Sequence, residues 1–414
     1  MRIVHAADIH LDSQLRGLER LGEEAASTLR RATRGAFANL VDLVRDNDAD
    51  ILVIAGDLYD GDWNDFATGA YFVSQMDILH QLGVPVVVAS GNHDAESQIT
   101  RSLRLPDNVR LLSTQSAESV HFQDLGLVVH GQGYATRDVT QNLAAAYPKR
   151  VAGMVNVGVL HTAVAGAPGH ASYAPCTAAE LEALQYDYFA LGHVHQRQAV
   201  LEGPHPAWFS GNLQGRHARE TGPKGALVID FDSGGPATPE FRPLDVARWE
   251  DVVVDVTGLT DTDAALDAAR AALDAASGSA EGRYTVARLR LIGSSAIASR
   301  FQDAEWINAE AEHLGGLTHT TVEKVVVNVS APKPPDPTAA RLRTSIADAA
   351  VLLSEDPAAL SSVTKVLDRS IREIAAGTDA HATYGLDLAD SDTVVALLER
   401  AVQALDAHLS ELDG

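Results

Sequence analysis

Carboxylate, amide and imidazole side chains follow five short apolar runs of this chain. Each run has the length and composition of a buried strand, and each ends in residues that can donate oxygen or nitrogen to a cation. Aspartate, asparagine and histidine suit Mn²⁺, Fe²⁺, Zn²⁺ and related ions. The five stretches are Asp8-Ile9-His10, Gly56-Asp57-Leu58-Tyr59-Asp60, Gly91-Asn92-His93-Asp94, Leu160-His161-Thr162 and Gly192-His193-Val194-His195. The sequence therefore predicts a metal site.

None of these stretches is strong evidence by itself. An isolated Asp-x-His or Gly-Asp is usually a helix cap or a turn, whereas Gly-His-x-His places two imidazoles on one face of an extended chain. A strand followed by a ligand-bearing loop is how an α/β scaffold gathers distant residues at one edge of a sheet. Five such stretches in one chain therefore favour a shared site over coincidence.

The ligand types also indicate a reaction class. Two divalent ions about 3.5–4 Å apart can share a bridging hydroxide and hold both oxygens of an in-line displacement at phosphorus. A central carboxylate can bridge the ions, and the ions lower the pKa of the bound water. A further imidazole can stabilise charged oxygens or protonate the leaving group. Hydrolysis of a phosphoester is the chemistry that this set predicts.

The elements between these stretches predict an α/β fold. Ile3–Ala7, Ile51–Ala55 and Val84–Ala89 read as buried strands, and helices are expected over Leu29–Asn47 and Phe66–Leu82. This alternation predicts a parallel sheet with right-handed crossovers. The remaining elements expected before residue 232 are three short strands in an antiparallel extension (Val109–Leu112, Ser119–Phe122, Leu127–His130), buried strands Val155–Leu160 and Tyr188–Leu191, helix Ala178–Leu184, and strands Pro206–Ser210 and Ala226–Phe231.

The pattern changes after Arg248, beyond a break near residues 232–236. Strands and helices then alternate as β-α-β-α-β, which predicts a small α+β domain. A stiff proline-rich linker at 332–337 follows, and three helices are expected at about 338–353, 357–376 and 391–412. The predicted divisions are 1–245, 246–331, 332–337 and 338–414. In the second, strands are expected over Asp251–Val256, Tyr284–Ile292 and Thr321–Val329, and helices over Thr262–Ala276 and Ala304–Leu314.

Composition limits the class of protein. The 414 residues are 46% apolar and 21% charged, as in soluble globular proteins with more than one domain. The single cysteine, Cys176, excludes an internal disulfide framework, reads as a plain small residue and agrees with a reducing cytoplasm. We expect no signal peptide and no membrane segment, because no run approaches the roughly 18 apolar residues that a span needs.

The net charge of −24 argues against a broad nucleic-acid surface, since phosphate contacts dominate such affinity. Part of the acidity belongs to the metal site, where bound cations reverse the local sign. The remainder favours a small anionic substrate, or nucleic acid that is held by metals and a few arginines.

The five stretches together resemble the ordered pattern of the calcineurin-like metallophosphoesterases: DxH, GDxxD, GNHD, H and GHxH. The likeness covers residues 1–230 and lacks no motif. Within that superfamily the chain is most similar to the SbcD-type bacterial DNA-repair exonucleases, especially the YhaO-like branch. The resemblance implies a sandwich of two mixed sheets flanked by helices, followed by a small α+β capping domain and C-terminal helices. The stretches that carry it are His5–Leu18, Ala55–Trp63, Asn92–Leu105 and Gly211–Gly225.

The resemblance also implies roles for single residues. His93 would be a catalytic histidine that binds no metal, and Asp60 would orient it. Asp57 would bridge two ions, usually Mn²⁺ in the nucleases and Fe or Zn elsewhere. The other ligands would be Asp8, His10 and His195 for the first ion, and Asn92, His161 and His193 for the second.

Several residues near these motifs allow two interpretations. Arg101, Arg104, Arg216 and Arg219 could contact phosphate or be exposed structural arginines, and we favour phosphate binding for Arg216 because it lies in the glycine-rich loop after the last histidine motif. His217 could contact substrate. Three aromatic residues could stack on a base or pack in the core: Tyr59, Trp63 and Tyr134.

Three functions remain open on the sequence. The first is a DNA exonuclease or endonuclease of DNA repair, a homodimer whose C-terminal helices bind an SMC-like ATPase (SbcC/YhaN-like). The second is a phosphodiesterase or phosphatase for nucleotides or other small phosphoesters, which the acidity favours. The third is a scaffold that mainly binds an ATPase. Leu398, Val402 and Leu405 begin an apolar seam that suits either a bundle helix or a partner-docking helix.

Overall fold

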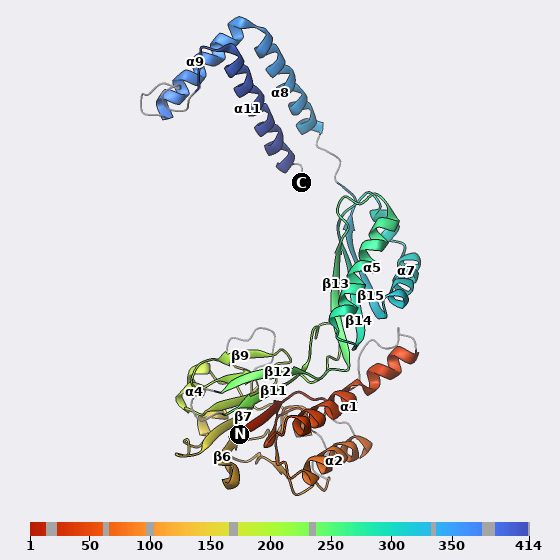
Figure 1. The fold of residues 1–414 in the computed structure, drawn as a ribbon, viewed down its shortest axis with the longest axis vertical. Helices are drawn as coiled ribbons and strands as arrows, with labels where there is room; N and C mark the ends of the chain where they lie inside the picture. The colour runs from red at the N-terminus through yellow and green to blue at the C-terminus, as the bar shows by residue number, and fades with distance from the viewer. Residues whose placement is uncertain are drawn as a thin grey trace. The chain divides into compact units, whose positions relative to one another are not determined.

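The computed structural model describes residues 1–13, 23–60, 66–96, 103–164, 173–231, 237–332, 337–374 and 386–412. The chain divides into two compact units, Met1–Ser330 and Ala331–Gly414. The first unit holds all five ligand-bearing stretches and three β-sheets, and the second is helical (Figure 1). Residue 245 lies inside the first unit, so the predicted domain boundary at this residue stays a prediction.

The first sheet has six strands in the order β12-β11-β1-β2-β3-β4. Its central strands run parallel, as the alternation of strands and helices predicted. The expected antiparallel role of β4 was wrong: β4 pairs with β3 in parallel, with Val86 opposite Val109. Residues 90–108 are long enough for the crossover that a parallel pair needs. The strands are β1 (Arg2–Ala6), β2 (Ile51–Ala55), β3 (Val86–Ala89), β4 (Val109–Leu111), β11 (Gly225–Asp230) and β12 (Thr238–Pro243).

The second sheet also has six strands, in the order β5-β6-β7-β8-β10-β9. β5 and β6 form the expected antiparallel pair, joined at Gly126, but they extend this sheet rather than the first. β6, β7, β8 and β10 are parallel neighbours, and β9 closes the edge antiparallel to β10. The strands are β5 (Glu118–Phe122), β6 (Leu127–Gly131), β7 (Val155–His161), β8 (Tyr188–Gly192), β9 (Gln198–Leu201) and β10 (Ala207–Phe209).

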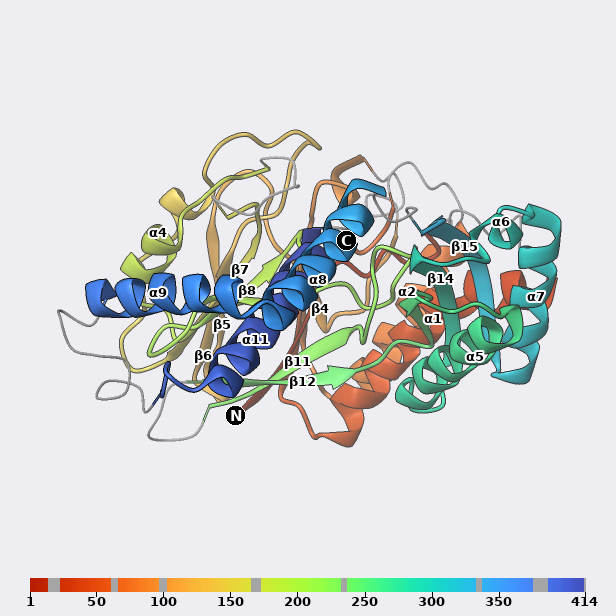
Figure 2. The same cartoon turned by 90° about the horizontal axis from the view of Figure 1, so that it is seen from above.

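The two sheets stack face to face between helices. α1 (Glu23–Asp46) and α2 (Phe66–Gln81) cover the outer face of the first sheet, and α4 (Ala178–Ala183) lies on the side of the second (Figure 2). Ile3 and Val53 of the first sheet meet Val157 and Tyr188 of the second in an inter-sheet core. Because both faces of each sheet are covered, the central strands are buried throughout and lack polar alternation. The predicted sandwich of two mixed sheets flanked by helices is confirmed.

Residues 247–330 build a third sheet with β13-β14-β15 all parallel. The predicted β-α-β-α-β order is confirmed, and β13 begins four residues before the expected Asp251. α5 and α7 lie beside this sheet (Figure 1), and their apolar side chains share one core with the strands. The elements are β13 (Ala247–Asp255), α5 (Thr262–Ser279), β14 (Tyr284–Ser294), α6 (Ala298–Phe301), α7 (Ala304–Leu317) and β15 (Thr320–Ser330).

The second unit contains the three expected helices: α8 (Pro337–Glu355), α9 (Pro357–Ile374) and α11 (Ser391–Leu412). Its small core includes Leu360, Leu388 and Val394. Leu405 of the proposed seam is exposed. Most of the predicted proline-rich linker, residues 333–336, lies outside the described residues. Among the helices that the structure describes, none has the length and apolar character to cross a bilayer.

Candidate metal centre

The ligand-bearing loops leave the carboxyl ends of β1, β2, β3, β7 and β8. The first two loops are tied together, because the N–H of Asp8 donates to Gly56 O at 3.0 Å and that of His10 donates to Asp57 O at 3.0 Å. Asp8, His10 and Asp57 all adopt left-handed backbone conformations, with φ of 50°, 46° and 53°. Such conformations cost non-glycine residues free energy and cluster at functional sites.

Two motif glycines make room for ligand side chains. A Cβ on Gly56 would lie 2.3 Å from His161 Nδ1, and one on Gly91 would lie 2.2 Å from Asp57 Oδ1. Gly56 also has φ of +96°, which other residues rarely adopt. Each glycine therefore lets one strand-end loop approach a side chain from another loop.

Asp94 locks the loops that carry Asp57 and Asn92. Its buried carboxylate accepts hydrogen bonds from the backbone N–H groups of Leu58, Tyr59 and Gly91, at 3.1, 2.9 and 2.9 Å. Burial, followed by the nearby charge of Asp57, raises the pKa of Asp94 to about 7. Asp94 thus has a structural task, although it closes the GNHD motif.

We expect Asp94→Ala to lower the free energy of unfolding by about 2–4 kcal/mol, because it leaves buried N–H donors without an acceptor. Urea unfolding followed by circular dichroism measures the loss. Asp107→Ala, at an exposed aspartate, is the matched control and should cost little. Equal stability of the two variants would show that the loops do not depend on Asp94.

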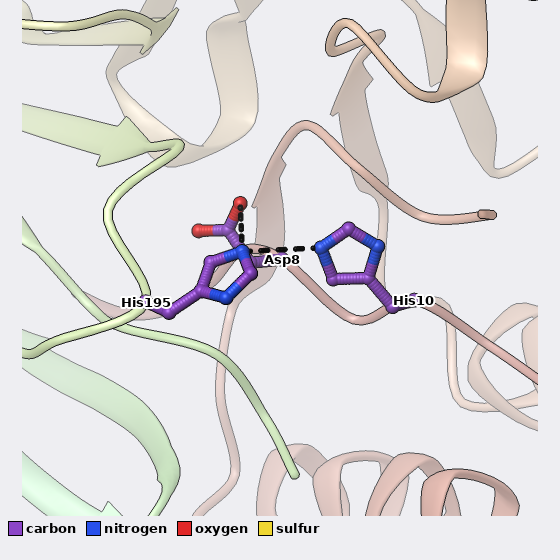
Figure 3. A group of neighbouring side chains, drawn as sticks. All are labelled: Asp8, His10 and His195. Carbon is purple, nitrogen blue, oxygen red and sulfur yellow. Dashed lines mark hydrogen bonds and ion pairs between the residues drawn. The ribbon is translucent and has the colours of Figure 1, made fainter. Parts of the chain in front are cut away.

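Three of the predicted ligands form one group (Figure 3). The Nε2 atoms of His10 and His195 lie 3.2 Å apart, and His195 Nε2 lies 3.9 Å from Asp8 Oδ1. Asp8 is held in place by the backbone N–H of His193, which donates to both carboxylate oxygens at 3.1 and 3.0 Å. These ligand atoms come from the ends of β1 and β8.

The other predicted ligands adjoin this group. His161 Nε2 lies 2.9 Å from Asn92 Oδ1 and 3.5 Å from Asp57 Oδ2. The His161 ring packs edge-on against the His193 ring, with 5.3 Å between the ring centroids. Asp57 Oδ2 is also 3.9 Å from His10 Nε2. Asp57 therefore lies within 4 Å of a residue in each group, and its role as a ligand that bridges two ions stays a prediction.

The protonation of His161 fits a cation at this place. Burial lowers the pKa of His161 to about 3, so the ring is neutral and has one N–H. That N–H is Nδ1, because Nδ1 lies 3.0 Å from the carbonyl oxygen of Ala55, which can only accept. Nε2 therefore presents a lone pair to the amide oxygen of Asn92. These two atoms, 2.9 Å apart, lie close enough to bind the same cation, so the donor set fits a divalent metal.

His93 is placed differently from the ligands. Its Nδ1 lies 2.8 Å from Asp60 Oδ1, and its side chain is 29% exposed, whereas His10 and His161 are buried. The hydrogen bond to Asp60 raises the pKa of His93 against the opposing effect of burial. Ser13 donates to the other Asp60 oxygen at 2.6 Å. His10, Asp60 and His93 also lie close enough to form a third group of ligand type.

Arg216 points into the same region, but two carboxylates already pair with it. Its guanidinium lies 3.7 Å from Asp60 Oδ2 and 3.6 Å from Glu220 Oε1, and its side chain is 16% exposed. Arg216 therefore brings positive charge beside His93 and Asp60 from the loop after β10.

Glu220 was not singled out in the sequence. Its Oε1 lies 2.6 Å from His195 Nδ1 and the residue is buried. Burial raises the pKa of Glu220, but the hydrogen bond from His195 and the charge of Arg216 outweigh it and hold that pKa below its ordinary value. Its place four residues after Arg216 was the only signal, and a glutamate in a loop has too many other uses to be chosen on that ground.

Some of the remaining candidate residues are buried and others are exposed. Tyr59 and Tyr134 are buried, so packing accounts for them rather than stacking on a base. Cys176 is buried, as expected of a small core residue. Arg104 and Arg219 are exposed. Arg101 and Trp63 lie outside the described residues.

Two family models match parts of this chain. Residues 1–197 match the calcineurin-like phosphoesterase family model, and residues 249–330 match the model of the middle domain of the metallophosphoesterase YhaO. The chain is 33% identical over 261 residues to the metallophosphoesterase YhaO of Bacillus subtilis (strain 168), covering 62% of this chain and 64% of that protein.

A second relative is the DNA double-strand break repair protein Mre11 of Methanopyrus kandleri, 28% identical over 286 residues, covering 62% of this chain and 60% of that protein. The chain thus spans less than two thirds of either relative. Two solved structures align over 93% of their own lengths: TT1561 of Thermus thermophilus (55% of this chain, 14% identity, TM-score 0.32) and a dimetal phosphatase from Danio rerio (56%, 13%, 0.36).

Proposed function

We propose that this chain, which carries a calcineurin-like metallophosphoesterase domain followed by a YhaO-type middle domain, is a metal-dependent phosphodiesterase that acts on DNA. The observation that carries the proposal is the position of Asp57 between two ligand groups, with the His93–Asp60 pair beside them. Two-metal sites of this kind are typical of nucleases and phosphatases. The likeness to a DNA repair protein named Mre11 supports DNA as the substrate.

The proposed ligand assignment follows the two groups, with Asp57 shared between them. Mn²⁺ is our proposed metal, because the oxygen and imidazole donors suit it, and Fe or Zn would also be accommodated. When bound, the ions would polarise the phosphoryl group and lower the pKa of water near phosphorus. The proposed ligands are Asp8, His10 and His195 for one ion, and Asn92, His161 and His193 for the other.

His93 is our proposed proton donor to the leaving oxygen. Its Nδ1–H is committed to Asp60, so the other ring nitrogen is left to give its proton to substrate. Asp60 fixes the ring orientation, while Ser13 and Arg216 hold Asp60. The partial exposure of His93 suits contact with a substrate. We propose that Arg216 adds positive charge where the phosphate binds.

We also propose that residues 246–330 cap the active site. Trp249 Nε1 donates to Gly215 O at 2.9 Å, and the Gln214 side chain donates to Ala247 O at 2.6 Å and accepts from the backbone N–H groups of Val246 and Ala247. These bonds join the loop that carries Arg216 to the first strand of the third sheet.

A substrate panel tests the DNA assignment. We expect the purified chain, stripped with chelator and reloaded with Mn²⁺, to degrade single- or double-stranded oligonucleotides as well as bis-p-nitrophenyl phosphate. The chelated protein should be inactive on all of them. Turnover of nucleotides or p-nitrophenyl esters without turnover of any oligonucleotide would contradict a nuclease and favour the second candidate.

That second candidate is an enzyme for nucleotides or other small phosphoesters. The net charge of −24 favours it, because a strongly acidic surface repels a long polyanion more than a small ester. The same panel distinguishes the two, since only a nuclease shortens labelled DNA.

The partner of the helical unit is a further proposal. Exposed apolar side chains at Leu342, Val351, Leu352, Val366 and Leu405 support docking of another protein, and we propose an SMC-like ATPase. Co-purification with the full chain but not with residues 1–331 would support this. Equal capture by both would contradict it. We also propose a homodimer, which light scattering of the full chain tests.

A further inference from the structure

We infer that Glu220 is a positioning residue that fixes the tautomer of His195 and thereby makes its Nε2 available as a metal ligand. This inference rests on the proposed function, in which His195 binds one of the ions. It concerns a residue outside the five motifs, in the loop that follows β10.

The carboxylate of Glu220 has a different task at each oxygen. Oε1 faces the His195 ring at 2.6 Å, with Arg216 Nη2 at 3.6 Å and His217 Nε2 at 3.7 Å around it. Oε2 accepts two hydrogen bonds, from the backbone N–H of Arg216 at 2.7 Å and from Asn212 Nδ2 at 3.0 Å. Both groups on the Oε2 side can only donate, so these two hydrogen bonds fix the orientation of the carboxyl group.

This arrangement determines which nitrogen of His195 carries the proton. A carboxylate only accepts, so the 2.6 Å contact requires a proton on Nδ1. In the neutral ring Nε2 then keeps its lone pair, directed at the Nε2 of His10 and the carboxylate of Asp8. The Arg216 Nη2 atom also lies 3.3 Å from His195 Nδ1, but a guanidinium cannot accept a proton from it. Glu220 alone among these neighbours selects the metal-binding tautomer.

Glu220→Gln should reverse the tautomer with almost no change in volume. The two donors behind Oε2 require the amide oxygen on their side, which turns the NH₂ group toward His195 Nδ1. Nδ1 then faces only donors, this NH₂ and Arg216 Nη2, so its lone pair must accept and the ring proton moves to Nε2. A protonated Nε2 has no lone pair for a metal ion.

We expect Glu220→Gln to weaken binding of one Mn²⁺ ion by about 10–100-fold and leave the other nearly unchanged, as for partners that orient metal-bound histidines. Isothermal titration of the metal-free full chain with Mn²⁺ measures both affinities. Glu118→Gln is the matched control, because Glu118 likewise accepts from a backbone N–H (Ser113, 2.6 Å) and from an arginine (Arg110, 2.7 Å). It should bind both ions as the wild type does.

The tautomer has its own readout. With ¹⁵N-labelled histidine in the metal-free protein, long-range ¹H–¹⁵N spectra should place the His195 proton on Nδ1 in the wild type and on Nε2 in Glu220→Gln. A His195→Gln spectrum assigns the signals. Unchanged tautomer and unchanged Mn²⁺ affinity in Glu220→Gln would overturn the inference while the proposed function stands. A wild-type chain that binds no Mn²⁺ would instead overturn the proposed function.

Discussion

Asp57→Asn is expected to lower the rate of phosphodiester hydrolysis by at least about a thousandfold, which corresponds to roughly 4 kcal/mol of transition-state stabilisation. Asp57 lies close to both ligand groups, 3.5 Å from His161 Nε2 and 3.9 Å from His10 Nε2. An amide removes its negative charge and leaves one neutral acceptor where two cations would be held. The loss of this charge should therefore weaken the binding of both ions and slow the reaction that depends on them.

Initial rates on bis-p-nitrophenyl phosphate and on labelled DNA, at saturating Mn²⁺, measure the effect. Asp187→Asn is the matched control, because Asp187 also accepts from a backbone N–H, that of Asn156 at 2.7 Å, on the second sheet. It should retain most of the activity. Hydrolysis by a folded Asp57→Asn protein at near wild-type rate would exclude the bridging role.

His93→Ala is expected to lower kcat by about 10²–10⁴-fold while both Mn²⁺ ions stay bound, as for loss of a general acid. The side chain and the backbone of His93 make different contacts. The imidazole reaches Asp60, whereas the backbone N–H donates to Asp57 Oδ1 at 2.9 Å. Truncation to alanine keeps the backbone bond, so the bridging carboxylate should remain in position.

Asn92→Ala provides the contrast for His93→Ala at the neighbouring residue. Removal of the Asn92 amide takes away the oxygen that lies 2.9 Å from His161 Nε2, and should therefore weaken the binding of one ion. Metal content by mass spectrometry after gel filtration, together with kcat, separates the variants. Loss of an ion from His93→Ala would mean that His93 is itself a ligand, an outcome that the nearby His10–Asp60–His93 group makes testable.

The sequence was sufficient to predict that the candidate ligand side chains lie close together, because they follow strands. Buried apolar runs are easily recognised, and the carboxyl ends of parallel strands meet at one edge of a sheet. Asp8, Asp57 and Asn92 therefore came together from three loops without any knowledge of side-chain contacts. The same signal predicted the main helices and the third sheet.

Residues outside such runs were less predictable. β4 was assigned the wrong direction, because a short strand does not reveal whether the chain before it crosses over or turns back. β9 and β12 were not predicted at all; both are edge strands that are not fully buried and so lack a strong apolar pattern. The role of Glu220 depends on a contact between loops that are distant in the sequence, so the sequence does not reveal it. The pairing of Arg216 with two carboxylates depends on contacts of the same kind.

The most direct test of the two-metal centre is the anomalous scattering of Mn²⁺ in crystals of the full chain. We expect two peaks about 3.5–4 Å apart. They should flank the Asp57 carboxylate, one near Asp8 and His195 and the other near Asn92 and His161. A single peak within the His10–Asp60–His93 group, or no peak beside Asp57, would contradict the proposed centre.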